Sequence, residues 1–456
     1  MAETAQQSLY AAQEKIYPRE IDGVFARLRI VAMVVLLGAY YLAAWIKWDG
    51  RQALLFDLPA RKFYVLGLVL WPQDFFFLSW LLIIAALSLF FFTALAGRIW
   101  CGYACPQTVW TEAFLWMEYL VEGKGAARRK LDASPWSANK VWRKSAKQAL
   151  WIAFSLWTGF TFVGYFTPIR QLGAEVVSLS LGGWETFWIL FYGFATYGNA
   201  GFMREQVCKY MCPYARFQSA MFDKDTLIVS YDQRRGEPRG SRARGSDPRA
   251  QKLGDCIDCR MCVQVCPTGI DIRKGLQYEC IACAACIDAC DGVMDKMQYP
   301  RGLIRYSTQH AMDGHKTDVI RPRIVVYATL LTLLCGGFIT ALVLRKPIDL
   351  DVIRDRNALF RESRPGYIEN VYTLRVINKD NQRHVYDVKA DGLPTLTVET
   401  DPAEVEVGPG EVRSIAARAL VEDGAAPGGG HTITFRLTAQ DAPALTVTKN
   451  ARLFTP

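Results

Sequence analysis

Histidine is scarce in this chain of 456 residues, and its distribution excludes several cofactors. The four histidines are His310, His315, His384 and His431. None of them lies in an apolar segment and there is no CxxCH, which argues against a haem held by axial histidine within a membrane. No GxGxxG, Walker loop or nucleophile elbow stands out, so we expect no bound nucleotide or flavin.

Charge is also scarce inside the long apolar segments. Charged side chains inside membrane-spanning segments mark ion pathways, so their near-absence argues against an ion pump or transporter. Residues 1–23 are polar and do not have the basic and then apolar start of a signal peptide. We attribute the formal net charge of +9 to an excess of lysine and arginine on one side of a membrane, not to nucleic-acid binding.

Apolar residues are gathered in five segments that predict membrane-spanning helices. About 21–23 residues at 1.5 Å each cover a hydrocarbon core of roughly 30 Å. The predicted spans are residues 25–46, 75–97, 149–170, 184–204 and 324–344. Lysine and arginine are concentrated in 98–148 and 205–323. This places both segments and the N-terminus in the cytoplasm and, after five crossings of the lipid bilayer, the C-terminus in the periplasm.

The C-terminal region, residues 358–456, alternates apolar and polar residues. Stretches such as YTLRVIN, HVYDVKA and TITFRLT are separated by turns rich in Gly, Pro and Asp. Short strands at this spacing predict an all-β immunoglobulin-like sandwich. Because the region has no cysteine, it lacks the disulfide of antibody domains, and we interpret it as a binding or docking module. We interpret the arginine-, glycine- and proline-rich segment 231–252 as a basic solvated linker rather than a site for an acidic partner or lipid headgroups.

The strongest signal is a repeated cysteine spacing. A CxxCxxCxxxCP run is formed by Cys256, Cys259, Cys262 and Cys266, and it is repeated without the proline by Cys280, Cys283, Cys286 and Cys290. In two-cluster ferredoxins with this spacing, the fourth cysteine of each run binds the other cluster. One [4Fe–4S] cluster is therefore assigned to Cys256, Cys259, Cys262 and Cys290, and the other to Cys280, Cys283, Cys286 and Cys266. A zinc module, the alternative, would favour paired CxxC units.

Two CxxxCP motifs, Cys101–Cys105 and Cys208–Cys212, follow the second and fourth predicted spans. Their similar flanks suggest an internal repeat, with both motifs at the cytoplasmic membrane face. If each stretch is helical, its two thiols share one side of the helix and the proline lies just beyond. Four converging thiols would suit Cu(I), a further iron–sulfur centre or a redox-active dithiol. The alternative is that these cysteines pack as small apolar residues at a helix junction.

Other candidate ligands near these motifs have a simpler interpretation. The nearby methionines Met203, Met211 and Met221 could add thioether ligands, but we interpret them as core residues. The pair His310 and His315 could bind copper or carry a quinone proton, but we interpret both as solvated loop histidines. Cys335 is interpreted as a small apolar residue of its helix.

The order of these features is similar to that of the CcoG (FixG/RdxA) family of cytochrome c oxidase accessory proteins. The resemblance rests on the two CxxxCP motifs, the stretch DTLIVSYDQRRGEPRG, the eight-cysteine region, the last span and the terminal sandwich, so it covers essentially the whole chain. It implies a membrane-bound polyferredoxin of the bacterial inner membrane with a periplasmic immunoglobulin-like domain. The family's membrane-face cysteines match Cys101, Cys105, Cys208 and Cys212, and its cluster ligands match the eight cysteines from Cys256 to Cys290.

The resemblance also implies a function. Members are associated with maturation of the cbb-type haem–copper oxidase through reduction of Cu(II) to Cu(I), so the chain would be an oxidoreductase of the cupric reductase type. Its expected partners are oxidase subunits or copper chaperones and an electron donor, either quinol or a cytoplasmic reductant, and a homodimer is left open. Two alternatives compete: a quinol-linked electron conduit to another partner, and a non-catalytic assembly scaffold that docks an oxidase subunit through the sandwich.

The expected domains follow from these assignments. They are a cytoplasmic N-terminal segment (1–24), a membrane domain with four helices and both CxxxCP motifs (25–230), the basic linker (231–252), a cytoplasmic two-cluster ferredoxin domain (253–323), the fifth transmembrane helix (324–344) and the periplasmic sandwich (358–456).

Overall fold

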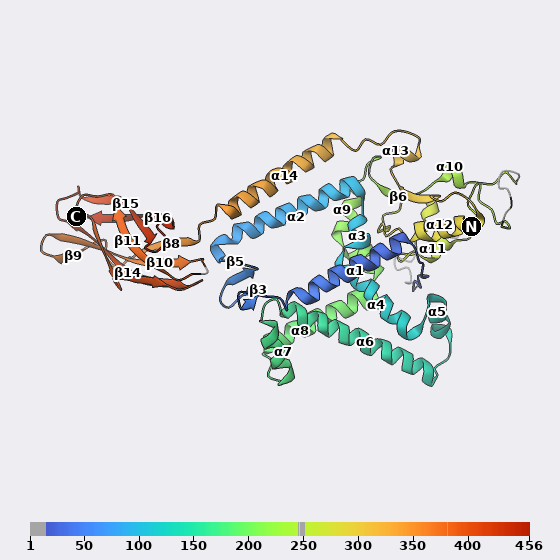
Figure 1. The fold of residues 1–456 in the computed structure, drawn as a ribbon, viewed down its shortest axis with the longest axis horizontal. Helices are drawn as coiled ribbons and strands as arrows, with labels where there is room; N and C mark the ends of the chain where they lie inside the picture. The colour runs from blue at the N-terminus through green and yellow to red at the C-terminus, as the bar shows by residue number, and fades with distance from the viewer. Residues whose placement is uncertain (1–14, 245, 247–250, 381) are drawn as a thin grey trace, which may run out of the picture. The chain divides into compact units, whose positions relative to one another are not determined.

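The computed structural model describes residues 15–244, 246, 251–380 and 382–456, and its contacts divide the chain into two units. The first unit contains the residues up to Leu55 together with Leu81–Leu334. The second contains Phe56–Trp80 and Cys335–Pro456. Figure 1 labels many of the helices and strands of both units.

Three helices in the described part of the chain are long and apolar enough to cross a membrane. They are α1 (Val24–Ala43), α2 (Phe75–Ala96) and α14 (Pro322–Val343). Their length and composition agree with three of the five predicted spans. The chain is therefore a membrane protein with a helical membrane part.

The other two predicted spans differ from the helices that form there. Residues 149–170 overlap α6 (Ala138–Val163), and 184–204 overlap α8 (Gly183–Thr196) and the π-helical stretch Tyr197–Met203. Helix α6 begins earlier than predicted because Ser137 caps it by accepting a hydrogen bond from the Lys140 amide. Its first turns are basic, and only the part after Lys147 has the apolar character on which the prediction relied.

Short elements complete the first unit. Its further helices are α3 (Ile99–Tyr103), α4 (Pro106–Glu122), α5 (Gly125–Ala133), α7 (Ile169–Val177) and α9 (Pro213–Met221). A core of Phe114, Trp151 and Ala200 joins α4, α6 and the π-helical stretch. Strands β1 (Lys47–Trp48) and β2 (Arg51–Gln52) form a hairpin after α1.

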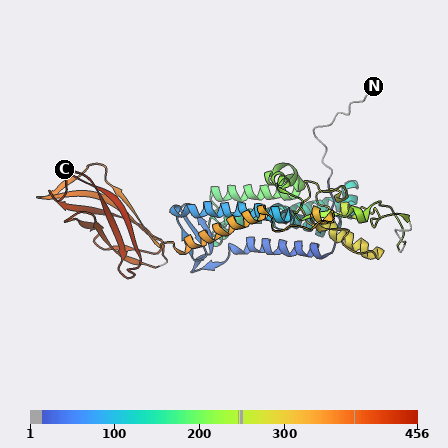
Figure 2. The same cartoon turned by 90° about the horizontal axis from the view of Figure 1, so that it is seen from above.

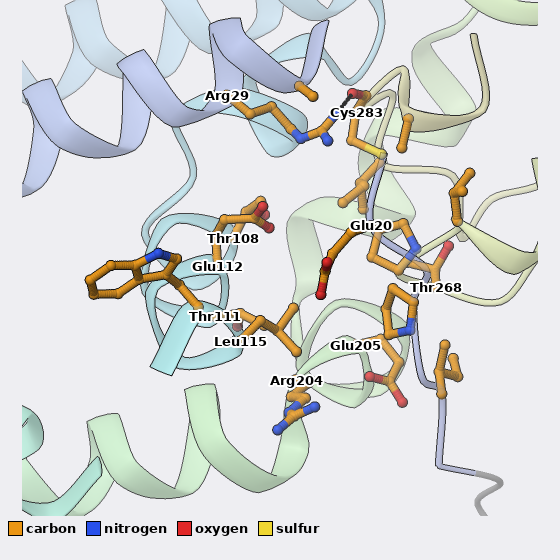
Figure 3. Close-up of a pocket in the computed structure, with 18 of the residues that line it drawn as sticks. Glu20, Arg29, Thr108, Thr111, Glu112, Leu115, Arg204, Glu205, Thr268 and Cys283 are labelled. Carbon is orange, nitrogen blue, oxygen red and sulfur yellow. Dashed lines mark hydrogen bonds between the residues drawn. The ribbon is translucent and has the colours of Figure 1, made fainter. Parts of the chain in front are cut away.

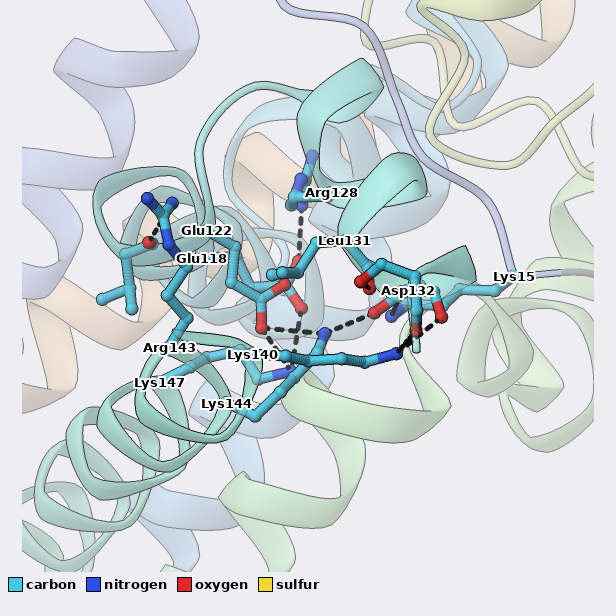
Figure 4. A network of polar contacts seen from close by, with 12 residues as sticks. Lys15, Glu118, Glu122, Arg128, Leu131, Asp132, Lys140, Arg143, Lys144 and Lys147 are labelled. Atoms are coloured by element: carbon cyan, nitrogen blue, oxygen red, sulfur yellow. Dashed lines mark hydrogen bonds and ion pairs between the residues drawn. The ribbon is translucent and has the colours of Figure 1, made fainter. Parts of the chain in front are cut away.

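A network of buried charges holds α4, α5 and α6 together (Figure 4). The Glu118 carboxylate, only 1% exposed, forms ion pairs with Arg128 at 2.5 Å and Arg204 at 2.7 Å. Glu122, one turn further along α4, pairs with Lys144 at 3.0 Å. Burial raises the pKa of Glu118, but Arg204 and the neighbouring cations outweigh it and hold the pKa below its usual value. The Glu118 carboxylate is therefore charged and matched by cations.

The eight-cysteine region is closed by an antiparallel strand pair, β6 (Ile228–Tyr231) with β7 (Ile304–Ser307). Between these strands lie α10 (Gln233–Gly236), α11 (Met261–Gln264), the 3-10 turn Ile272–Lys274 and α12 (Ala285–Met297), and α13 (Gln309–Met312) follows. The region thus begins before residue 253. Within the predicted linker 231–252, Arg235 pairs with Asp255 at 2.5 Å and Arg242 donates to the Tyr299 hydroxyl at 3.0 Å.

The C-terminal part of the second unit is a two-sheet sandwich, drawn in orange to red in Figures 1 and 2. One sheet has the order β12-β14-β10-β8, with β9 also paired to β10, and the other has the order β13-β11-β15-β16. The strands are β8 (Ile348–Arg354), β9 (Arg361–Arg364), β10 (Tyr367–Asn378), β11 (His384–Asp391), β12 (Thr397–Asp401), β13 (Val405–Val407), β14 (Val412–Glu422), β15 (Gly429–Ala439) and β16 (Thr446–Thr455). Alternate residues of both sheets form one apolar core, as the sequence predicted. Strand β8 lies before residue 358, the predicted start of this domain.

Two buried polar groups fix the second unit. Asp74, 5% exposed, accepts a hydrogen bond from Arg345 at 2.5 Å and pairs with Lys379 at 3.5 Å. The His384 ring lies between Asp441 at 2.7 Å and Asp380 at 3.1 Å.

Strands β3 (Leu54–Asp57), β4 (Lys62–Val65) and β5 (Leu68–Leu70) form a small antiparallel sheet before α2.

Candidate metal centres

The eight cysteines of the repeated motif surround two separate cavities. One cavity is lined by Cys256, Cys259, Cys262 and Cys290. The other is lined by Cys266, Cys280, Cys283 and Cys286, and Cys262 reaches its edge. The structure therefore brings together the same two sets of four that the sequence assigned to two clusters, including the exchange of the fourth cysteines.

Both loops share an unusual backbone conformation around their second cysteine. Asp258 and Arg260 flank Cys259 with φ of 53°, and the equivalent residues Ala282 and Ala284 flank Cys283 with φ of 54° and 59°. Non-glycine residues rarely adopt positive φ, because the Cβ then crowds the backbone. Alternation of right- and left-handed residues turns successive amides toward one concave side, which suits an anionic group such as a cluster with its thiolates.

The cysteine thiols around these cavities are poorly solvated. Burial raises the pKa of Cys262 and Cys280 to about 11, and that of Cys283 and Cys290 to about 12. Thiolates at such positions need nearby positive charge, which iron supplies in an iron–sulfur cluster. The residues present therefore fit [4Fe–4S] clusters, with the four cysteines of each cavity as the ligands.

In the part of the chain that the structure describes, no three His, Cys, Asp or Glu side chains are close enough to hold one metal ion. Two sulfur ligands of one zinc ion lie at most about 4.6 Å apart, twice the Zn–S bond length. Each set of thiols is instead spread around a cavity. That arrangement fits a group of several atoms better than a zinc module.

The CxxxCP motifs do not lie on continuous helices, which was the condition for both thiols of a motif to share one side of a helix. Cys101 is in α3, but the helix ends at Tyr103, and Cys105 immediately precedes α4, which begins at Pro106. Proline favours this first helical position because its missing N–H needs no partner there. The second motif repeats the arrangement, with Cys208 in a π-helical turn (Val207–Met211) and Pro213 at the start of α9.

The four CxxxCP thiols nevertheless converge. Burial, together with the neighbouring Cys105 and Cys208, raises the pKa of Cys101 to about 12. Burial likewise raises the pKa of Cys208 to about 11, with contributions from Cys105 and Cys212. Each motif thus acts on the thiols of the other, and the two motifs form one four-cysteine site. The Cys101 thiol donates a hydrogen bond to Gln218 of α9 at 3.4 Å.

The four-cysteine site is directly adjacent to the second cluster loop. A Cβ atom on Gly102 would lie 2.8 Å from the Ile281 carbonyl, and 2.9 Å from the Ala282 carbonyl and from Cys283 Cα. Arg98, 4% exposed, donates to the carbonyls of Tyr278 and Ala215. Its charge also lowers the pKa of Cys101, Cys208 and Cys280, against the larger effect of burial.

The cluster region is also attached to the start of α1. Asp288 of α12 accepts hydrogen bonds from the Ala26 amide at 2.7 Å and the Phe25 amide at 3.2 Å. These amides have no partner within their own helix, so the carboxylate caps α1 from a distant segment. Sequence reasoning missed Arg98, Gly102 and Asp288, because nothing in their local pattern indicates a partner far along the chain.

The remaining candidates contribute less. His310 lies in α13 rather than in a loop, with its ring 2.8 Å from Asp225 and its ring centroid 6.1 Å from that of His315, whose side chain is exposed. Met211 is 56% exposed rather than part of a core. Cys335 lies within α14, as predicted.

Comparisons with known proteins agree with this organisation. Residues 203–309 match the profile of a "4Fe-4S dicluster domain", residues 78–129 that of a "4Fe-4S binding domain", and residues 338–456 that of an "IG-like fold at C-terminal of FixG". Nitrogen fixation protein FixG of Rhizobium meliloti is 40% identical over 86% of this chain and 82% of its own length. Protein RdxA of Cereibacter sphaeroides is 40% identical over 85% of this chain and 84% of its own.

The chain belongs to the FixG/RdxA family. It is thus an iron–sulfur electron-transfer protein of the oxidoreductase type with membrane helices. A crystal structure of a FixG-related protein from Vibrio parahaemolyticus is 32% identical and covers 24% of this chain and 98% of its own, with a TM-score of 0.22. The two iron–sulfur profiles together also include all four CxxxCP cysteines.

Proposed function

We propose that this FixG/RdxA protein reduces Cu(II) to Cu(I) at the four-cysteine site, for maturation of a cbb-type cytochrome c oxidase. The observation that carries the proposal is the close contact between Gly102 and the backbone of the Cys283 loop. Cys101 is the residue next to Gly102 in the chain, so it lies beside this loop. The clusters, when bound, supply single electrons, and reduction of one Cu(II) ion consumes one. The family resemblance supplies copper as the substrate.

The chain's own residues prepare the four-cysteine site for a soft ion. Cys101 and Cys208 have raised pKa values, so their thiols are protonated at neutral pH and lose their protons as a metal ion binds. Thiolate ligands favour Cu(I) over Cu(II), which shifts the couple toward reduction. Arg98 offsets part of the negative charge that develops.

We also propose that α6 and the α8 segment cross the membrane, making five spans with the clusters in the cytoplasm and the sandwich in the periplasm of a bacterial inner membrane. Gly159 of α6 and Gly193 of α8 support this. A Cβ on Gly159 would lie 2.9 Å from the Gly193 nitrogen, and small residues allow this close approach between membrane helices. The basic residues of α6 all precede its apolar part, as the positive-inside rule requires. Oxidase subunits or copper chaperones are the proposed partners of the sandwich.

A redox titration tests the function. The anaerobically purified protein is reduced, freed of reductant and mixed with Cu(II) and a Cu(I)-specific chelator, while cluster bleaching and Cu(I) are followed. We expect one Cu(I) for each electron lost from the clusters. The Cys101→Ser, Cys105→Ser, Cys208→Ser and Cys212→Ser variant should lose Cu(I) formation but keep both clusters. Cys335→Ser, which removes a thiol of α14, is the matched control.

Two results would contradict the proposal. Clusters that stay reduced in the presence of Cu(II) would remove copper as the substrate. Loss of cluster absorbance in the four-cysteine variant, with Cys335→Ser unaffected, would show that these cysteines serve cluster assembly.

A further inference from the structure

A cavity of about 350 Å³ lies between α1, α4 and the second cluster loop (Figure 3). Its wall contains Cys283 of the cluster loop and Cys208 of the four-cysteine site, so it reaches both cysteine systems. Helix α1 contributes Ile30 and Met33, and α4 contributes Leu115. The cavity is therefore bordered by a helix of membrane-spanning length and by a cluster ligand.

Polar and charged side chains line this cavity together with apolar ones. The Glu20 carboxylate projects into the cavity and faces α4 in Figure 3, and α4 contributes Thr111 and Glu112 to the lining. Arg29 of α1 donates a hydrogen bond to the Cys283 carbonyl at 2.5 Å. Ligand sites of about 300–1,000 Å³ with apolar walls and a few convergent polar groups are typical for small molecules.

The arginines of the wall are already engaged. Arg29 bonds the Cys283 carbonyl, while Arg128 and Arg204 pair with Glu118. Arg19 donates to the Met261 sulfur at 3.1 Å. An anion such as a lipid phosphate would therefore compete for cations that have partners. A neutral ligand whose hydroxyl groups donate to the carboxylates of Glu20 and Glu112 fits the cavity better.

We infer that this cavity binds the headgroup of a membrane quinol, which donates electrons to the cluster beside Cys283. The inference rests on the proposed function, since it names the donor for the same electron path. Oxidation of one quinol breaks two O–H bonds and releases two protons and two electrons. The carboxylates of Glu20 and Glu112 accept the protons. The electrons pass singly to the two [4Fe–4S] clusters, one to each, and a quinone leaves.

The test uses the full-length oxidised protein in detergent without oxygen. Decylubiquinol and menadiol are added separately, and cluster bleaching is followed along with equilibrium binding of the matching quinones. We expect saturable bleaching with one quinol consumed for each pair of clusters. Leu115→Trp fills the cavity and should weaken quinone binding at least about tenfold. Leu120→Trp places the same side chain on the exposed side of α4, where Leu120 is 57% exposed, and should not change binding.

A second variant tests the chemistry independently of the cavity's shape. The double variant Glu20→Gln and Glu112→Gln should reduce its clusters about 100-fold more slowly at saturating quinol, the scale of lost general-base catalysis. Bleaching by neither quinol would overturn the inference, as would equal loss of binding in Leu115→Trp and Leu120→Trp. Release of bound phospholipid by the quinones without any bleaching would also overturn it and identify a lipid site.

The outcomes separate this inference from the proposed function. Quinol-reduced clusters that do not react with Cu(II) would leave the quinol site and remove the copper reaction. Clusters that no quinol reduces, but that reduce Cu(II) after reduction by dithionite, would keep the copper reaction and remove the quinol site.

Discussion

Replacing Gly102 with alanine tests the contact between the four-cysteine site and the cluster loop. The new Cβ would lie 2.8–2.9 Å from three backbone atoms of residues 281–283. Comfortable carbon contacts begin near 3.5 Å, so α3 and the loop must separate by about 0.6–0.7 Å. Overpacking of this size costs about 1–3 kcal/mol. Both sides of the contact are backbone, so no flexible side chain can yield instead.

Gly292 provides the matched control. It lies in α12, and nothing would lie within 4 Å of an added Cβ. Alanine is favoured over glycine in a helix interior by about 1 kcal/mol, a gain that applies to Gly292 but not fully to Gly102 near the end of the five-residue α3. The difference in unfolding free energy between Gly102→Ala and Gly292→Ala is therefore the overpacking cost of about 1–3 kcal/mol plus at most about 1 kcal/mol of helix propensity.

The measurement is denaturant unfolding of the cluster-loaded protein, followed by the visible absorbance of the clusters. We expect a lower midpoint for Gly102→Ala than for Gly292→Ala, together with slower transfer from dithionite-reduced clusters to Cu(II). Equal midpoints and equal transfer rates would refute the reasoning, because they would show that the loop yields without cost and that the contact does not define the electron path.

Three other perturbations have expected outcomes. Glu118→Gln leaves Arg204 buried without its charge partner and should destabilise the protein by about 3–5 kcal/mol in thermal or denaturant unfolding, with both clusters retained in the folded fraction. Asp74→Asn similarly leaves the buried ammonium of Lys379 with less compensation, and hydrogen exchange should increase in β10 and its neighbours but not in α4. Burial lowers the pKa of His384, but hydrogen bonds with two carboxylates outweigh it and raise the pKa above its usual value. The charged ring therefore stabilises the sandwich fully below about pH 6.5, and this contribution is lost as the pH rises through the folded-state pKa of His384. Hydrogen exchange in the sandwich that does not change across this pH range would contradict the prediction. The same pH dependence of hydrogen exchange in His384→Gln would also contradict it.

Features that depend on local pattern could be predicted from the sequence. The two cysteine sets follow from ligand spacing within short loops, and alternation located strands such as β10, β11 and β15. The helices α1, α2 and α14 followed from uninterrupted apolar length. In each of these cases the residues that determine the feature are close together in the chain, so no knowledge of distant partners was needed.

The errors came from helix boundaries and distant partners. The apolar run predicted a span from residue 149, but α6 begins before that run, because basic residues can extend the same helix into a polar region. The spacing of Cys101 and Cys105 is compatible with one helix, and the break depends on how Pro106 begins the next one. Strand β8, with the sequence IDLDVIR, was missed because its partner β10 is separated from it in the chain.

Several distant contacts of the CxxxCP motifs reach residues around one of the two cluster cavities. Gly102 touches residues 281–283, Arg98 bonds the Tyr278 carbonyl, and Lys209, next to Cys208, donates to the Thr268 carbonyl at 3.0 Å. These contacts surround the cavity of Cys266, Cys280, Cys283 and Cys286. The other cavity is enclosed by α12 and β7 residues such as Met294 and Ile304. The cluster of the second cavity is therefore the one next to the four-cysteine site.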